Sequence, residues 1–138
     1  MIKPIIVNKA LLKQVSTPAL ISDQYMIQDL IDTFNNAPDC IGMAANMIGC
    51  FKTILVYSDS NNKSQVIINP KILSKKDSYI AYENCECFKN EAPIKCIRYK
   101  QIKLEYLNID FQKRIKTFKG LEAESIQHQI DHFNGIII

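Results

Sequence analysis

Two histidines near the end of the chain have the spacing that binds one metal ion from a helix. His128 and His132 stand four residues apart, and they are the only histidines of the sequence. This spacing places both imidazoles on one helical face. In zinc hydrolases the residue after the first histidine is normally a glutamate that serves as general base. Here it is Gln129, whose amide forms hydrogen bonds but takes up no proton at physiological pH.

A third possible ligand is Cys85. Three protein ligands with an open fourth position are typical of a catalytic tetrahedral site. Histidine pairs at this spacing are also often solvated, and a single cysteine is often only a buried thiol. The residues alone therefore leave a metal site and an ordinary helix as alternatives.

Three ordered segments together resemble the peptide deformylase family. They are residues 42–49 (GMAANMIG), 83–87 (ENCEC) and 128–132 (HQIDH). Family members carry Gly-Leu-Ala-Ala-Pro-Gln, Glu-Gly-Cys-Leu-Ser and His-Glu-x-x-His at comparable positions. Residues 68–70, 118–121 and 134–135 match as well, so the resemblance covers nearly the whole chain.

The resemblance implies an α+β fold in a single domain of residues 1–138, with short antiparallel sheets around a central metal-bearing helix. It implies that Cys85, His128 and His132 hold a divalent metal, with iron(II) expected first and zinc or nickel as alternatives. In active members the metal activates the water that attacks the formyl carbon of an N-formylmethionyl peptide. The helix glutamate takes the proton of this water and later protonates the leaving amine.

Two catalytic groups of the family are replaced in this chain. Gln129 stands in place of the base, and Met47 stands in place of a glutamine that donates to the oxyanion. A thioether has no N–H to donate. The first hypothesis is therefore a deformylase with weak or lost activity, and the alternative is a non-catalytic relative, a pseudoenzyme, that binds metal or formylated peptides.

Glu86, beside Cys85, offers a further alternative. It could act as a displaced general base that restores function, it could serve a different metal-dependent amidase, or it could simply face solvent, because alternate strand residues face opposite sides. Its backbone N–H could supply half of the oxyanion hole. Glu83 and Asp131 are predicted to support the ligands from behind, with Arg98 as a candidate partner.

The resemblance also implies where a peptide would bind. Ile41, Gly42 and Met43 match the family strand that pairs with an extended substrate, which here would be an N-formylmethionyl peptide or nascent chain. Gly42 would allow close approach of the ligand backbone.

Composition fits one small domain with one core. The chain has 138 residues, 47% of them hydrophobic, and a net charge of +3 with lysines spread among acids along the sequence. We therefore expect no direct nucleic-acid recognition. No apolar run is long enough for a membrane span, and no signal peptide is evident, so we expect a cytoplasmic protein without membrane attachment. Five cysteines without regular spacing argue against a disulfide framework.

Hydrophobic periodicity predicts strands followed by a helix in the second half of the chain. A first helix is expected from Ser22, as its cap, through about Ala37. Strands are expected at residues 53–57 and 65–68 as a hairpin, around residues 102–106, and at 114–118. A second helix is expected over about residues 121–134, and a terminal strand at 136–138.

Overall fold

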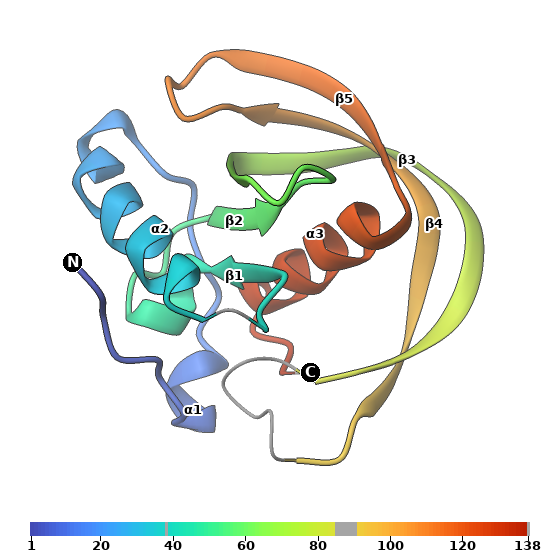
Figure 1. The fold of residues 1–138 in the computed structure, drawn as a ribbon, viewed down its shortest axis with the longest axis horizontal. Coiled ribbons are helices and arrows are strands. Elements are labelled where there is room, and N and C mark those ends of the chain that lie inside the picture. Colours follow the sequence, from blue (N-terminus) through green and yellow to red (C-terminus); the bar gives the residue numbers. More distant parts are fainter. Residues whose placement is uncertain (38, 85–90, 138) are drawn as a thin grey trace.

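The computed structural model describes residues 1–37, 39–84 and 91–137. One antiparallel sheet with strand order β1-β2-β3-β4-β5 wraps around the helix α3 (Figure 1). The strands are β1 (Gly42–Ala44), β2 (Ile54–Ser58), β3 (Ser64–Glu83), β4 (Ile94–Leu107) and β5 (Lys113–Lys119). The helices are α1 (Lys9–Leu12), α2 (Ile27–Asn35) and α3 (Gly120–Phe133). The predicted α+β class is confirmed.

The predicted β2–β3 hairpin is confirmed, and its turn is held by one side chain. Asp59 accepts hydrogen bonds from the backbone N–H of Asn61 and Lys63 at 2.9 and 3.0 Å. Ser58 then pairs with Ser64, which sets the register of the two strands. Local turn chemistry therefore fixes which residues of β2 and β3 face the core.

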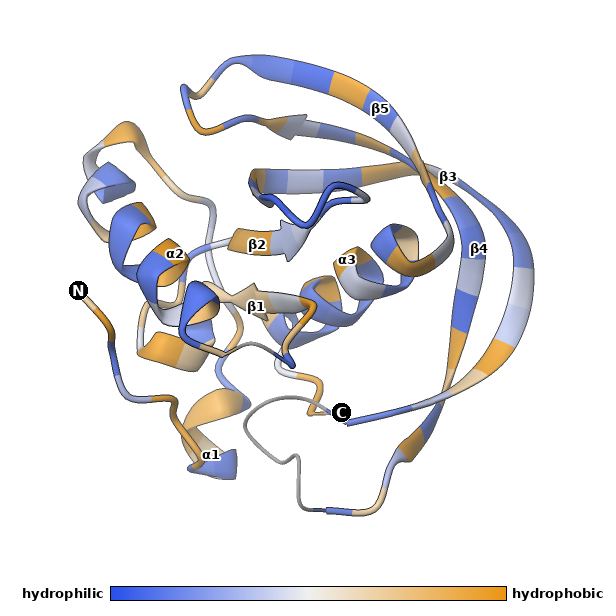
Figure 2. Cartoon of the chain, in the orientation of Figure 1, coloured by the Kyte–Doolittle hydropathy of each residue, from blue (hydrophilic) through white to orange (hydrophobic). Residues whose placement is uncertain are grey.

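The core lies on the concave side of the sheet, against α3. Ile102, Leu104 and Phe118 are almost fully buried there, and Ile126 of the helix is fully buried against the same cluster. Hydrophobic and hydrophilic residues alternate along the strands (Figure 2). This alternation is the pattern of a sheet with one face packed and one face solvated.

The first predicted helix is only partly correct. A 3-10 helix occupies Ile21–Met26, and the α-helix begins at Ile27 and ends at Asn35. Ser22 does not cap it. Asp23 accepts a hydrogen bond from the backbone N–H of Leu20 at 2.8 Å, so the capping interaction begins two residues earlier than predicted.

The predicted terminal strand is wrong for Ile136 and Ile137, which lie in no strand, and Ile138 lies outside the described residues. Gly135 adopts a positive φ of 74° and ends α3. The backbone N–H of Ile136 then returns to the carbonyl of Asp131 at 3.0 Å. The helix end thus uses the N–H that a strand would need. Within the described ranges, no helix is long and apolar enough to cross a membrane.

Candidate metal centre

Helix α3 holds the two predicted ligand histidines side by side. The rings of His128 and His132 lie 4.8 Å apart between centroids, and both side chains are buried. Ile126 and Phe133 face the core from the same helix. The i and i+4 spacing therefore produces the expected pair of imidazoles on one face.

A buried ionic network fixes the orientation of His128. Its Nδ1 lies 2.8 Å from the Oε1 atom of Glu83, at the end of β3. Arg98 of β4 donates to both carboxylate oxygens of Glu83, at 2.8 to 3.2 Å, and to Asp131 at 2.7 Å. The predicted partnership of Arg98 with these two acids is confirmed. A histidine whose Nδ1–H faces a carboxylate presents its other ring nitrogen as a ligand.

The charge of Glu83 is maintained by these contacts. Burial alone would raise the pKa of its carboxyl, but the hydrogen bonds with His128, Glu124 and Arg98 outweigh burial and hold the pKa well below its usual range. The hydrogen bond with Glu83 conversely raises the pKa of Glu124. Glu83 is thus an ionised acceptor placed behind His128.

The Nε2 atom of His132 is a candidate metal ligand. Its Nε2 is buried and has no hydrogen-bond partner among residues 1–37, 39–84 and 91–137. Buried polar atoms are normally paired. The orphaned nitrogen therefore fits a bound metal ion, with His128 as a second ligand.

The rest of the predicted ligand set cannot be placed. Cys85 and Glu86 lie outside the described residues. Among the residues that the structure describes, no three His, Cys, Asp or Glu side chains form a metal-binding group. Cys85 as third ligand and Glu86 as alternative base stay predictions.

Gln129 lies on the same helix, packed against β1. Its side chain is buried, and no described residue bonds to its Oε1 atom. A Cβ atom added to Gly42 would lie 3.0 Å from the Gln129 Nε2 atom and 2.2 Å from the Ser125 Oγ atom. Glycine is therefore needed at position 42 for β1 to pass this close to the helix. The Ser125 hydroxyl also donates to the carbonyl of Ile41, at 3.1 Å.

The Met47 side chain folds back toward the backbone of Ala44. It lies in the 3-10 helix Ala45–Ile48, it is buried, and its sulfur accepts a hydrogen bond from the N–H of Ala44 at 3.4 Å. The side chain is an acceptor here and offers no N–H donor.

The segment predicted to bind the peptide forms one edge of the sheet. Gly42 and Met43 pair with Tyr57 and Val56 of β2, and in the described part of the chain β1 has no other strand partner. Met43 is fully buried, whereas Ile41 is 42% exposed. An edge strand presents the unpaired backbone groups that an extended peptide can bind.

Sequence reasoning missed two buried side chains that position α3. The Gln127 amide donates to the carbonyl of Tyr99 and accepts from its N–H, both at 2.8 Å. The Asn46 amide donates to the carbonyl of His132 at 3.0 Å. Gln127 directly precedes His128, which was the one available signal. Asn46 gave none, because its partner is 86 residues away.

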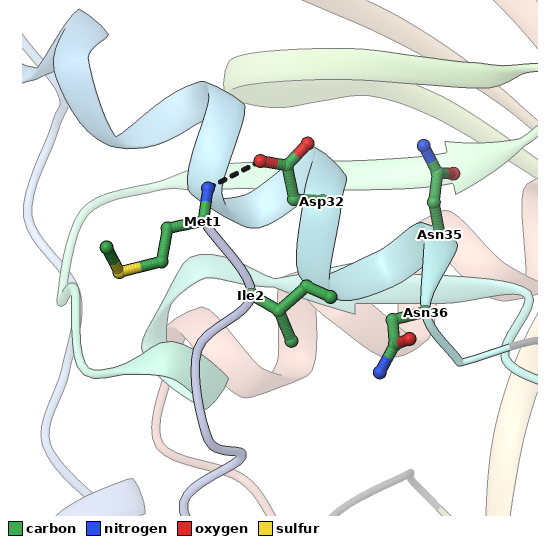
Figure 3. A pocket seen from close by; sticks show the side chains of 5 residues that line it. All are labelled: Met1, Ile2, Asp32, Asn35 and Asn36. Atoms are coloured by element: carbon green, nitrogen blue, oxygen red, sulfur yellow. Dashed lines mark hydrogen bonds and ion pairs between the residues drawn. The ribbon is translucent and has the colours of Figure 1, made fainter.

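A shallow hollow of about 500 Å³ lies elsewhere, between the N-terminal residues and α2. Its lining residues are Met1, Ile2, Asp32, Asn35 and Asn36 (Figure 3). The terminal ammonium of Met1 pairs with Asp29 and Asp32 at this place. No candidate site residue lines the hollow, so it is separate from the histidine pair.

Comparison with known proteins agrees with this geometry. The family model described as polypeptide deformylase matches residues 2–138. Peptide deformylase of Clostridium beijerinckii is 43% identical over the full length of both chains, and that of Rhizobium meliloti is 31% identical over 99% of this chain and 82% of its own. Crystal structures of peptide deformylases from Legionella pneumophila and Thermotoga maritima both superpose with TM-scores of 0.88. They are 28% and 27% identical, cover 99% of this chain, and are themselves covered to 83% and 95%. Fold, histidine pair and sequence matches together show that this chain belongs to the peptide deformylase family.

Proposed function

We propose that this chain is a deformylase relative that binds N-formylmethionyl peptides, such as nascent chains in the cytoplasm, beside a divalent metal and hydrolyses them weakly or not at all. The buried amide of Gln129 carries this proposal. It matches the position of the family's catalytic base, directly after His128, whose ring is held by Glu83 and Arg98.

The metal would be held by His128, His132 and Cys85, with iron(II) as the first candidate and zinc or nickel as alternatives. When bound, it would polarise the formyl group and activate water. Glu83 would keep His128 oriented toward it, as carboxylates behind metal-binding histidines do.

The role of Gln129 would be to hold and orient water or the bound peptide. Its orphaned Oε1 can accept a hydrogen bond from water or from the peptide, but the amide cannot accept the proton. A general base typically contributes about 10²–10⁴-fold to the rate, so this replacement alone predicts a severe loss.

Met47 would add a second loss on the oxyanion side. Removal of one oxyanion donor costs on the order of 10²–10³-fold in rate. The Met47 sulfur is already occupied by the N–H of Ala44, which supports a settled apolar position for this side chain. The two losses need not add, because residues that act as one unit give non-additive effects.

Peptide binding is the function that would survive. The free edge of β1 and the glycine at position 42 provide backbone hydrogen bonds and close approach without the base. This feature favours the second candidate, a non-catalytic peptide-binding relative.

The test measures metal, binding and turnover on one sample. Anaerobically purified, iron-loaded protein is assayed for metal content, for affinity toward N-formyl-Met-Ala-Ser by calorimetry, and for its deformylation. Bound metal and peptide with little turnover would support the proposal. Turnover within about tenfold of an active family enzyme would refute the role assigned to Gln129.

Two variants make the assay decisive. His132→Ala should lose the metal and provides the blank. Glu86→Gln tests the alternative base: loss of residual turnover at unchanged metal content would assign proton transfer to Glu86.

A further inference from the structure

Three lysines on neighbouring strands meet on the outer face of the sheet. Lys76 of β3 and Lys119 of β5 both pair with Gln101 of β4, from its two sides. One row further along, Lys103 of β4 pairs with Ser74 and Thr117. Six side chains that can all donate hydrogen bonds therefore form two adjacent rows across three strands, here called the donor grid: Ser74, Lys76, Gln101, Lys103, Thr117 and Lys119.

Burial fixes the side on which the donor grid lies. Ile102, Leu104 and Phe118 are buried toward α3, whereas Lys103 and Lys119 are their exposed sequence neighbours. Adjacent strand residues face opposite sides. The lysines therefore point away from α3, onto the convex face of the curved sheet (Figure 1).

The charges of the donor grid have no local compensation. Among the described residues, no acidic side chain pairs with Lys76, Lys103 or Lys119, whereas the next part of the same face contains the ion pair of Lys113 with Glu105, at 3.0 Å. Protection of the sheet edge would explain Lys119 on β5 and Lys76 on β3, because β2 pairs with β3 only over residues 64–68, but Lys103 has a strand partner on both sides.

We propose that the donor grid binds the phosphate backbone of a nucleic-acid duplex without reading its sequence. Lysine, hydroxyl and amide donors are the groups that proteins direct at phosphate oxygens. A lipid bilayer fits this surface less well, because the face is convex and the donor grid has no large apolar side chain to insert. The proposal departs from the expectation that net charge alone gave, since pairing of the strands gathers lysines that are dispersed along the sequence.

The test compares two variants with equal loss of charge. One carries Lys76→Gln, Lys103→Gln and Lys119→Gln. The control carries Lys9→Gln, Lys13→Gln and Lys63→Gln, which lie outside the sheet face. Both bring the formal net charge from +3 to 0 (3 − 3 = 0). Binding to a fluorescent RNA duplex of about 16 base pairs, the span of one double-stranded RNA-binding domain, is measured by anisotropy between 50 and 200 mM salt.

The expected result is a difference between the variants in the salt dependence of duplex binding. Three phosphate contacts contribute about −0.9 each to the slope of log affinity against log salt, which is about 40-fold over this range. The donor-grid variant should lose that contribution, the control should keep it, and Lys103→Gln alone should lose about 0.9. Circular dichroism and melting of each variant show that the fold is retained.

Three results would overturn the proposal. The first is no duplex binding by the unmodified chain at 50 mM salt. The second is an equal loss in both triple variants, which would show that only net charge matters. The third is binding to vesicles of anionic phospholipid in preference to the duplex, which would assign the face to a membrane surface.

Discussion

The two flanks of α3 differ in how completely their buried polar groups are paired. On the His128 flank, Glu83, Arg98 and Asp131 form a closed network of charged hydrogen bonds. On the Gln129 flank, the amide oxygen has no hydrogen-bond partner among the described residues, and the Met47 sulfur accepts from the N–H of Ala44. The ionic network and the two replaced side chains, Gln129 and Met47, can therefore be altered separately, although both sets are buried.

Restoring the reactive flank should produce the largest effect. Gln129→Glu combined with Met47→Gln should raise kcat/KM for N-formyl-Met-Ala-Ser by at least about 10²-fold, because a base and an oxyanion donor are returned to a supported site. The measurement uses iron-loaded protein with metal content matched to the unmodified chain. A double variant with full metal and no gain would show that the site has decayed beyond these two residues.

Removing the buried cation of the network of Glu83, Arg98 and Asp131 should lower the free energy of unfolding. Arg98→Met leaves Glu83 and Asp131 without their buried cation, which typically costs about 3–5 kcal/mol of the free energy of unfolding. Urea unfolding measures this loss. Lys100→Met, on the exposed part of the same strand, is the control and should change stability little. Equal effects of the two variants would contradict the importance of the network.

Weakening one contact of the network should reduce metal affinity more than stability. Glu83→Gln removes the carboxylate behind His128, and such changes typically lower metal affinity by about 10–100-fold. Competition with a chromophoric chelator provides the readout. The matched control is Glu122→Gln, because its carboxylate accepts a hydrogen bond from the Ser60 N–H at 3.2 Å and, in the described part of the chain, none from His128 or Arg98. Unchanged affinity for Glu83→Gln would exclude it as a positioning residue.

A substitution at the contact between α3 and β1 should give the smallest effect. Gly42→Ala forces a methyl group against the Ser125 Oγ atom and should destabilise the fold by about 1–3 kcal/mol. In a Ser125→Ala background the same change should cost less, because the closest atom is gone. A double-mutant cycle by thermal melting tests this coupling, and additive losses would contradict the close approach.

The sequence predicted those parts that carry a local pattern. The β2–β3 turn, the alternation around Leu104 and the histidine spacing on α3 each depend on residues within a few positions of one another. The second half of β3, which follows Ile72, was not predicted. Its residues beyond Ile72 are mostly polar and exposed, so pairing with β4 defines the strand instead of a buried face.

Contacts between segments that are distant in the sequence likewise limited what could be predicted about the site. Glu83, Arg98 and Asp131 were named only because they match or border family motifs, and the residues themselves do not reveal their 2.7–3.2 Å contacts. Asn46 and Gln127 bond to backbone carbonyls, which carry no sequence signature. Cys85 and Glu86 lie outside the described residues, so the roles predicted for them stay predictions.

The side-chain amide of Gln127 couples detachment of α3 to local opening of β4. Pairing of β4 with β5 ends at Gln101, and two residues earlier the N–H and carbonyl of Tyr99 both bond to this one side chain. The helix therefore cannot lift from the sheet without exposing the Tyr99 amide to solvent. Hydrogen exchange at this single amide would report how often α3 detaches from the sheet.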